Sequence, residues 1–324
     1  MKLQTYSGAG STARVLSKGK NAGLSKTILY VKQNYDLYLF LAPSIIYFII
    51  FCYVPMYGVQ IAFKNFVPGN GIAGGSWAGF THFERFFNSH YFWLLIKNTL
   101  GISIYSLVAG FPAPILLALM VNQVVNERFK KIVQTVTYAP YFISTVVIVG
   151  MLTIFLNLNS GLINQLIKLC GGESIFFMAK PEWFKTIYVF SGIWQSTGWG
   201  SIIYLAALSS VSMELYQAAI VDGANKFQRI WYIDIPSIIP TAVILLILNC
   251  GSLMSVGFEK AYLMKNSLNA SSAEIIATYV YEVGLIGAQY SFSAAVGLFN
   301  SVINFILLLI VNKISKSAAN ISLW

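Results

Sequence analysis

Three motifs in the sequence carry residue types suited to nucleotide or metal chemistry, and each fails on spacing or context. The glycines of Gly69–Gly74 match a dinucleotide-binding fingerprint, but no strand precedes them and no helix is expected to open on them. The pair Gly19-Lys20 lacks both the glycine five residues earlier and the following hydroxyl residue of a phosphate-binding P-loop. His82 and His90 have no cysteine or histidine cluster beside them. The sequence therefore predicts no catalytic residue, no metal site and no ATP site.

A second group of polar residues lies inside long apolar stretches. Asn249, Ser252, Ser255 and Glu259 are spaced by three, three and four residues, so on a helix they would share one face. A polar group inside a membrane is costly, and it indicates either hydrogen bonding between helices or a lined pathway. The predicted pathway residues are Trp194, Gln195, Trp199, Asn249, Ser252, Ser255, Glu259 and Asn300. The alternative is that the tryptophans only pack and the asparagines only bond between helices.

The elements that must position these residues are membrane helices. Apolar residues make up 57% of the chain and charged residues 10%, against norms of about 45–50% and 25% in soluble domains. A span needs about 20 mainly apolar residues. Six stretches qualify, at Leu37–Val59, Asn98–Val121, Ile132–Leu156, Ile187–Val211, Ser237–Phe258 and Phe292–Val311. Because these runs are continuously apolar, helices are favoured over barrel strands, and the predicted fold is an all-α membrane protein with six transmembrane helices.

The basic residues predict how these helices are oriented. Residues 1–34 form a tail with six basic residues and no acidic one, and this tail is too long and polar for a cleaved signal peptide. A cytoplasmic tail puts three, two and two further basic residues on the inner side, against eight on the outer side. Both termini are therefore predicted to be cytoplasmic, with residues 35–324 as the transmembrane domain. The net charge of +10 is a topology signal and does not indicate nucleic-acid binding.

The segment between the fourth and fifth predicted spans combines helix signals with an unusual surface. Ser212 is placed to cap a short helix, and the charge of Glu214 suits the first turn of that helix. Leu215, Ala219 and Gly223 recur every fourth residue and give the helix a face of small side chains. Gly223 can take the left-handed conformation that ends a helix. The segment is too polar for a membrane and too apolar for a free loop, which predicts a docking surface for another protein.

This segment resembles the Glu-Ala-Ala loop of ABC importer permeases, whose pattern runs Glu-Ala-Ala, Asp-Gly-Ala, then Ile-x-x-Pro. The docking positions that the resemblance implies are Gln217, Ala218, Ala219, Asp222, Gly223, Ala224, Phe227, Ile233 and Pro236. Gln217 stands where the family usually has glutamate. A salt bridge that the family makes with its ATPase at this position becomes at most a neutral hydrogen bond.

The resemblance extends from about Tyr35 to Trp324. Over this range the chain is similar to the sugar-type permeases for oligosaccharides of complex polysaccharides, a group that includes rhamnogalacturonan and alginate-oligosaccharide importers. The motifs that carry it are Pro55-Met56-Tyr57-Gly58, Tyr138–Ser144, Gly257-Phe258-Glu259, Tyr279-Val280-Tyr281 and Ser322-Leu323-Trp324. They are specific to the family and silent on the identity, length and charge of the sugar. In such a pathway an aromatic beside amides and hydroxyls suits the apolar faces and hydroxyl rims of sugars.

The resemblance also implies the partners and the location. It implies a type I ABC importer permease in the bacterial cell membrane, paired with a second homologous permease as a heterodimer. Two ATPase subunits would dock on the loop, which acts as a coupling helix, and would bind ATP and magnesium, so that this chain carries no cofactor. An extracellular solute-binding protein would deliver the oligosaccharide. The alternative from another class is an ion-coupled secondary transporter, for which an intramembrane charge relay and an inverted repeat of spans are expected and neither is clear. A membrane-bound enzyme lacks any nucleophile–base constellation.

Overall fold

The computed structural model describes residues 32–319 and 322, and these residues form helices and loops without a β-sheet. The described residues divide into two units, with the boundary between Gly58 and Val59. The predicted tail, residues 1–34, lies almost wholly outside the described residues, as does most of the Ser322–Trp324 motif. In the first unit, helix α2 (Tyr35–Phe48) continues through the π-helix η1 (Ile49–Tyr53) into α3 (Val54–Met56). The first predicted span coincides with this helical run, which extends from Tyr35 to Phe63.

In the second unit, three further runs are long and apolar enough to cross a membrane. Helices α5 (Tyr91–Gly110) and α6 (Pro112–Asn122) form one such run, α12 (Lys226–Arg229) through η5 (Ile230–Asp234) to α13 (Ile235–Gly251) a second, and α17 (Tyr290–Ala319) a third. Helix α10 (Pro181–Ser209) packs against α5, α6, α7 and α13. Two bent helix pairs bring the candidate spans to as many as six, which agrees with the predicted fold class.

The third predicted span, Ile132–Leu156, is wrong as a continuous helix. Helix α7 (Glu127–Tyr138) and the 3-10 turn η4 (Ala139–Phe142) meet α8 (Thr145–Phe155) at an angle of 98°. Pro140 removes one backbone donor near the break, and Ser144 takes an extended conformation and caps α8 with its hydroxyl. The sequence pattern contains both signals, yet the apolar run on either side concealed them.

The fifth predicted span, Ser237–Phe258, is too long at its end. Helix α13 stops at Gly251, and residues 252–257 have no helical structure before α14 begins (Phe258–Met264). At Gly251 a Cβ atom would lie 2.6 Å from Cδ1 of Leu308, so glycine lets the Leu308 side chain of α17 pack closely against α13. Asn249, Ser252, Ser255 and Glu259 therefore do not share the face of one helix, contrary to the prediction.

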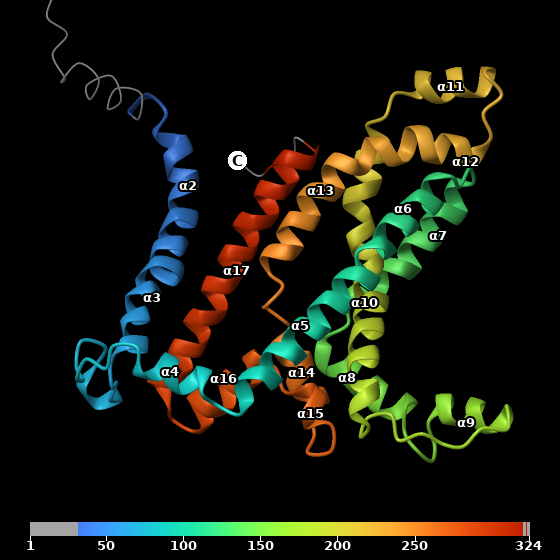
Figure 1. Cartoon of the computed structure of the whole chain (residues 1–324). Helices are drawn as coiled ribbons and strands as arrows, with labels where there is room; N and C mark the ends of the chain where they lie inside the picture. The colour runs from blue at the N-terminus through green and yellow to red at the C-terminus, as the bar shows by residue number, and fades with distance from the viewer. Residues whose placement is uncertain (1–31, 320–321, 323–324) are drawn as a thin grey trace, which may run out of the picture. The chain divides into compact units, whose positions relative to one another are not determined.

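The two ends of the second unit carry different helices. At one end, helix α11 (Met213–Val221) lies beyond α12, near the start of α7 and the last turns of α17 (Figure 1). The helices at this end carry seven basic residues: Arg128, Lys130 and Lys131 on α7, Lys226 and Arg229 on α12, and Lys313 and Lys316 on α17. The opposite end carries α4 (Thr81–Phe87), α9 (Leu162–Leu169), α14, α15 (Ala270–Ala273) and α16 (Ile276–Tyr281).

Candidate docking loop and candidate pathway

Residues 212–236, called the helical loop below, begin with a capped helix. The Ser212 hydroxyl oxygen accepts a hydrogen bond from the Glu214 N–H at 3.2 Å, which confirms the predicted cap. At the other end Gly223 has a φ of +79°, which confirms the predicted left-handed residue. The Ala224 N–H donates to the Ala219 carbonyl at 2.8 Å, so the turn closes back on the helix in a Schellman-type stop.

A second helical turn follows at once and is capped in both directions. The Gln228 N–H donates to Oδ1 of Asn225 at 2.9 Å, and the Asn225 N–H donates to Oε1 of Gln228 at 2.8 Å. The sequence shows this capping box as Asn-x-x-Gln, but the prediction did not include it. After it, the chain passes through η5 and enters α13, with Pro236 in the first turn of that helix.

The helical loop exposes apolar side chains. Val221 is 87% exposed and Phe227 83%, and Met213, Leu215 and Ile220 are each more than half exposed. Of the nine predicted docking positions, Gln217, Ala218, Asp222, Gly223, Phe227 and Pro236 are exposed, and Ala219, Ala224 and Ile233 are half-buried. An apolar surface on short helices beside membrane spans is typical of a site that another protein covers.

A buried aspartate ties the helical loop to the membrane helices. Asp234 is fully buried, and its carboxylate accepts hydrogen bonds from the Tyr216 hydroxyl on α11 and from Nε2 of Gln123 (2.8 Å), the residue that follows α6. Burial, and then the hydrogen bond to Asp234, raise the pKa of Tyr216 to about 12. The sequence prediction missed this cluster, although an aspartate inside the run Ile233-Asp234-Ile235 was a signal for it.

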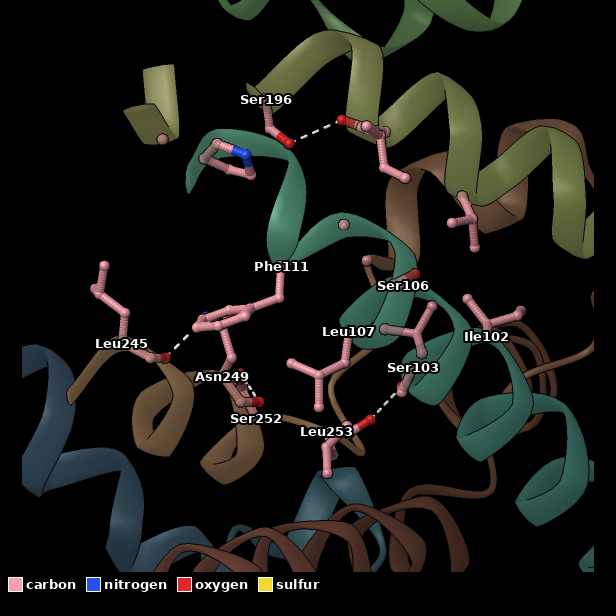
Figure 2. Close-up of a pocket in the computed structure, with 18 of the residues that line it drawn as sticks. Ile102, Ser103, Ser106, Leu107, Phe111, Ser196, Leu245, Asn249, Ser252 and Leu253 are labelled. Atoms are coloured by element: carbon pink, nitrogen blue, oxygen red, sulfur yellow. Dashed lines mark hydrogen bonds between the residues drawn. The ribbon is translucent and has the colours of Figure 1, made fainter. Parts of the chain in front are cut away.

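A cavity of about 510 Å³ lies between α5, α6, α10 and the end of α13. Four predicted pathway residues line it, Trp199, Asn249, Ser252 and Ser255. Figure 2 shows Asn249 and Ser252 on one wall facing Leu107 and Phe111 on another. Further hydroxyl residues add to the lining: Ser196 from α10, and Ser103 and Ser106 from α5, which the prediction missed.

An aromatic pair stands at the wall formed by α10. The rings of Trp199 and Tyr141 stack with centroids 4.7 Å apart and planes 6° from parallel, and both residues line the cavity. Tyr141 belongs to the Tyr138–Ser144 motif and was not predicted as a pathway residue. Stacked aromatic faces beside hydroxyl and amide groups suit the apolar and polar sides of a sugar ring.

The other four predicted pathway residues do not line this cavity. Trp194 lines a separate, apolar cavity of about 560 Å³ next to α8 and α9. Gln195 donates to the Ile143 carbonyl at 3.1 Å and so holds the break before α8. Glu259 is exposed on α14, and Asn300 lies on α17 with its Oδ1 buried and without a hydrogen-bond partner among the described residues. Glu259 was predicted from a helix face that ends with α13, and the other three were predicted only because they are polar or aromatic residues inside predicted spans.

Long-range hydrogen bonds shape the end of α13 beside the cavity. Asn304 on α17 accepts from the Met254 N–H at 2.8 Å and donates from Nδ2 to the Ser255 hydroxyl oxygen at 2.9 Å. The hydroxyl of Ser103, on α5, donates to the Leu253 carbonyl. These bonds satisfy the Met254 N–H and the Leu253 carbonyl, two backbone groups that the end of α13 leaves without helical partners. No local sequence pattern indicates them.

Residues 110–319 match the family described as binding-protein-dependent transport system inner membrane component. The chain is 45% identical over 304 residues to protein LplB of Bacillus subtilis (strain 168), covering 94% of this chain and 95% of the relative. It is 45% identical over 289 residues to the polygalacturonan/rhamnogalacturonan transport system permease protein YteP of the same organism, covering 89% and 90%. A crystal structure of a bacterial alginate ABC transporter in complex with alginate pentasaccharide-bound periplasmic protein contains a chain that is 41% identical, with a TM-score of 0.83 over 90% of this chain and 98% of that chain.

A bundle of apolar helices around a hydroxyl-lined and aromatic-lined cavity, with this degree of likeness to an ABC transporter chain, is a multi-pass membrane permease. The chain belongs to the family of binding-protein-dependent transport system inner membrane components and has the fold of ABC importer permeases. The match favours this class over the ion-coupled secondary transporter.

Proposed function

We propose that this chain is one transmembrane subunit of an ATP-driven importer for oligosaccharides, which an extracellular solute-binding protein delivers. The observation that carries the proposal is the cavity with the stacked pair Tyr141 and Trp199, on a fold that superposes on a chain of an alginate ABC transporter with a TM-score of 0.83. Two B. subtilis relatives at 45% identity support it, one of them named as a polygalacturonan/rhamnogalacturonan transport permease.

In this proposal the helical loop is the docking site of the ATPase subunits. Its exposed apolar side chains support a protein partner, and the nine predicted positions from Gln217 to Pro236 form the contact. ATP and magnesium bind to those partner subunits, and this chain has no cofactor and catalyses no reaction. A second homologous permease completes the passage. The helical loop and both termini face the cytoplasm, which the seven basic residues near the helical loop support.

The cluster around Asp234 gives the coupling a physical route. Closure of the ATPases moves α11, and the hydrogen bond from Tyr216 to Asp234 carries that movement to the start of α13. The bond from Gln123 to the same carboxylate carries it to the end of α6. Both helices line the cavity, α13 with Asn249 and α6 with Pro114, so their movement changes the shape of the passage. A buried carboxylate with two neutral donors resists separation, because each lost bond leaves a polar group unsatisfied.

The proposal is tested by the growth of a deletion strain on a panel of plant and algal oligosaccharides as sole carbon source. We expect loss of growth on one oligosaccharide class, restored by the intact gene, with growth on the corresponding monosaccharide unchanged. Uptake of a radiolabelled oligosaccharide should stop in the same strain. Unchanged uptake of every oligosaccharide in the panel would contradict the proposal.

A further inference from the structure

Lys260 on α14 is a buried cation beside the cavity. It is only 8% exposed, and its Nζ donates to the backbone carbonyl of Tyr188 at 2.9 Å and lies 4.9 Å from the centre of that tyrosine ring. A Cβ atom at Gly192 would be 3.4 Å from the same Nζ. Tyr188 and Gly192 both line the cavity, so the ammonium group lies directly behind its wall.

A second lysine approaches the same end of the cavity from the neighbouring helix. The Lys185 side chain lies along α5, where a Cβ atom at Gly101 would be 2.7 Å from its Nζ. Lys185 lies one turn before Val189, and its Nζ lies beside Gly101, the residue before Ile102. Both Val189 and Ile102 line the cavity. Lys97, one turn before Gly101 on α5, adds a further positive charge that acts on Lys185.

These lysines differ from the other lysine of this region in their partners. Lys265 forms salt bridges with Glu274 and with Glu282. Among residues 32–319, by contrast, Lys97, Lys185 and Lys260 have no carboxylate within salt-bridge distance. Of the three, Lys260 is buried, Lys185 is half-buried and Lys97 is exposed. A buried charge without a counter-ion is costly, and the Lys260 ammonium group offers three donors, of which one is used on a protein carbonyl. Such a charge is expected where a ligand supplies the missing anion.

We propose that Lys260, Lys185 and Lys97 make this end of the cavity a recognition site for carboxylate groups, so that the permease favours acidic oligosaccharides, such as chains of uronic acids, over neutral ones. The inference rests on the proposed import of oligosaccharides and specifies the substrate class. A uronate carboxylate entering here exchanges water for a fixed positive field inside a low-dielectric wall, where charges interact more strongly than in water. A neutral sugar gains nothing from that field, and this difference produces selectivity.

The test measures binding in the cavity directly, so that the preference of the solute-binding protein does not enter. The assembled importer, with Ser252→Cys in the permease and its three native cysteines removed, is placed in phosphatidylcholine nanodiscs without binding protein. Trigalacturonate and its fully methyl-esterified, uncharged form are compared as protectants of Ser252→Cys against a water-soluble thiol reagent. We expect the acid to protect at a concentration about ten-fold below that of the ester.

Three variants assign the preference to residues. Lys260→Met and Lys185→Gln should each raise the concentration of acid needed for protection to nearly that of the ester, while the concentration of ester needed stays the same. Lys168→Gln removes the same charge from an exposed position on α9 and should keep the full preference. Addition of phosphatidylglycerol should leave the ratio of acid to ester unaltered.

Several outcomes would overturn the inference. Equal protection by acid and ester in the native background would show that the lysines do not select charge. A loss of protection by both sugars in the lysine variants would mean that these residues only support the fold. A preference that disappears with phosphatidylglycerol would assign them to lipid phosphates. If a neutral arabinan oligosaccharide protects and is imported but no acid preference exists, the import function stands and this inference fails; if no oligosaccharide protects or is imported, both fail.

Discussion

The helical loop and the cavity are held together by opposite kinds of contact. Hydrogen bonds within residues 212–229 join positions at most five apart, such as the bond from the Ala224 N–H to the Ala219 carbonyl. Around the cavity, the Ser103 hydroxyl reaches the Leu253 carbonyl 150 positions away, and the Met254 N–H reaches Asn304 50 positions away. The loop is therefore a locally determined element with outward-facing apolar groups, whereas the cavity exists only once four helices have assembled. Substitutions within residues 212–229 should change coupling alone, whereas a substitution at the buried Asp234, which accepts a hydrogen bond from the distant Gln123, should also change stability. Substitutions at the cavity should change both stability and transport.

The largest effect is expected for Gly223→Asp in the helical loop. The position is open, with no atom within 4 Å of a Cβ, so the side chain has room in the isolated subunit, although the φ of +79° strains residues other than glycine there. Against a docked ATPase the carboxylate would lose its water without gaining a partner, and substrate-stimulated ATP hydrolysis should be abolished while membrane insertion stays normal. Gly223→Asn is the matched control, because asparagine tolerates a φ of +79° and carries no charge. Normal stimulation in the aspartate variant would mean that this turn is not at the interface.

A smaller loss of coupling is expected for Asp234→Asn. The amide group of asparagine turns a donor toward the Tyr216 hydroxyl or the Gln123 amide, and one buried donor then loses its acceptor at a cost of about 1–3 kcal/mol. Stimulated ATP hydrolysis should fall about ten-fold, and the melting temperature in detergent should fall as well. Glu214→Gln removes an exposed charge from the same loop and should change neither quantity. A full stimulated rate for Asp234→Asn would show that movement reaches α6 and α13 by another route.

This difference between local and long-range contacts explains how much the sequence could predict. The cap at Ser212 and the turn at Gly223 were predicted correctly, because cap and turn preferences act over a few residues. Four of the six predicted spans, the first, second, fifth and sixth, fall on single helical runs long and apolar enough to cross a membrane, because apolar length alone identifies them. The fourth falls on α10, which belongs to a bent helix pair. The break before α8 was missed, since the apolar stretch continues across it.

The cavity was predicted only in part for the same reason. Asn249 and Ser252 were identified, but through a helix face that ends at Gly251, beside which Leu308 of α17 packs. Asn304, which holds residues 254 and 255, has no local signal because its partners are about 50 positions away. The sequence pattern marks polar residues in apolar runs but does not indicate which of them face one another.

Cysteine accessibility tests which residues border the passage. In a background without the three native cysteines, Ser252→Cys and Ser255→Cys should react rapidly with a water-soluble thiol reagent, because both positions line the cavity and are exposed. Leu246→Cys, which lies on α13 away from the cavity lining, should react at least about ten-fold more slowly, since apolar packing suppresses the thiolate. Reaction at position 246 but at neither serine position would mean that these serines belong to helix packing and that the passage lies elsewhere.

An effect opposite in sign to that of Asp234→Asn is expected for the stability of Lys260→Met. Burial lowers the pKa of Lys260 to about 8 from an ordinary 10.5, so below pH 8 the folded protein holds a charge that the unfolded chain would keep in water. Between pH 8 and 10.5 the unfolded state binds the additional proton, and the stability of the native protein therefore rises with pH across that window. Methionine fills the same space without charge, so at pH 7 the variant should be more stable by at most about 3 kcal/mol, and this advantage should shrink as the pH rises above 8. Thermal unfolding in detergent at pH 7.0 and 9.5 without sugar measures both quantities, with the exposed Lys226→Met in the helical loop as a control that should change neither. A Lys260→Met variant that is less stable than the native protein at pH 7 would show that this lysine stabilises the fold through its bond to Tyr188. A variant that is more stable but no longer prefers acidic sugars would show that the buried charge costs stability and serves substrate binding.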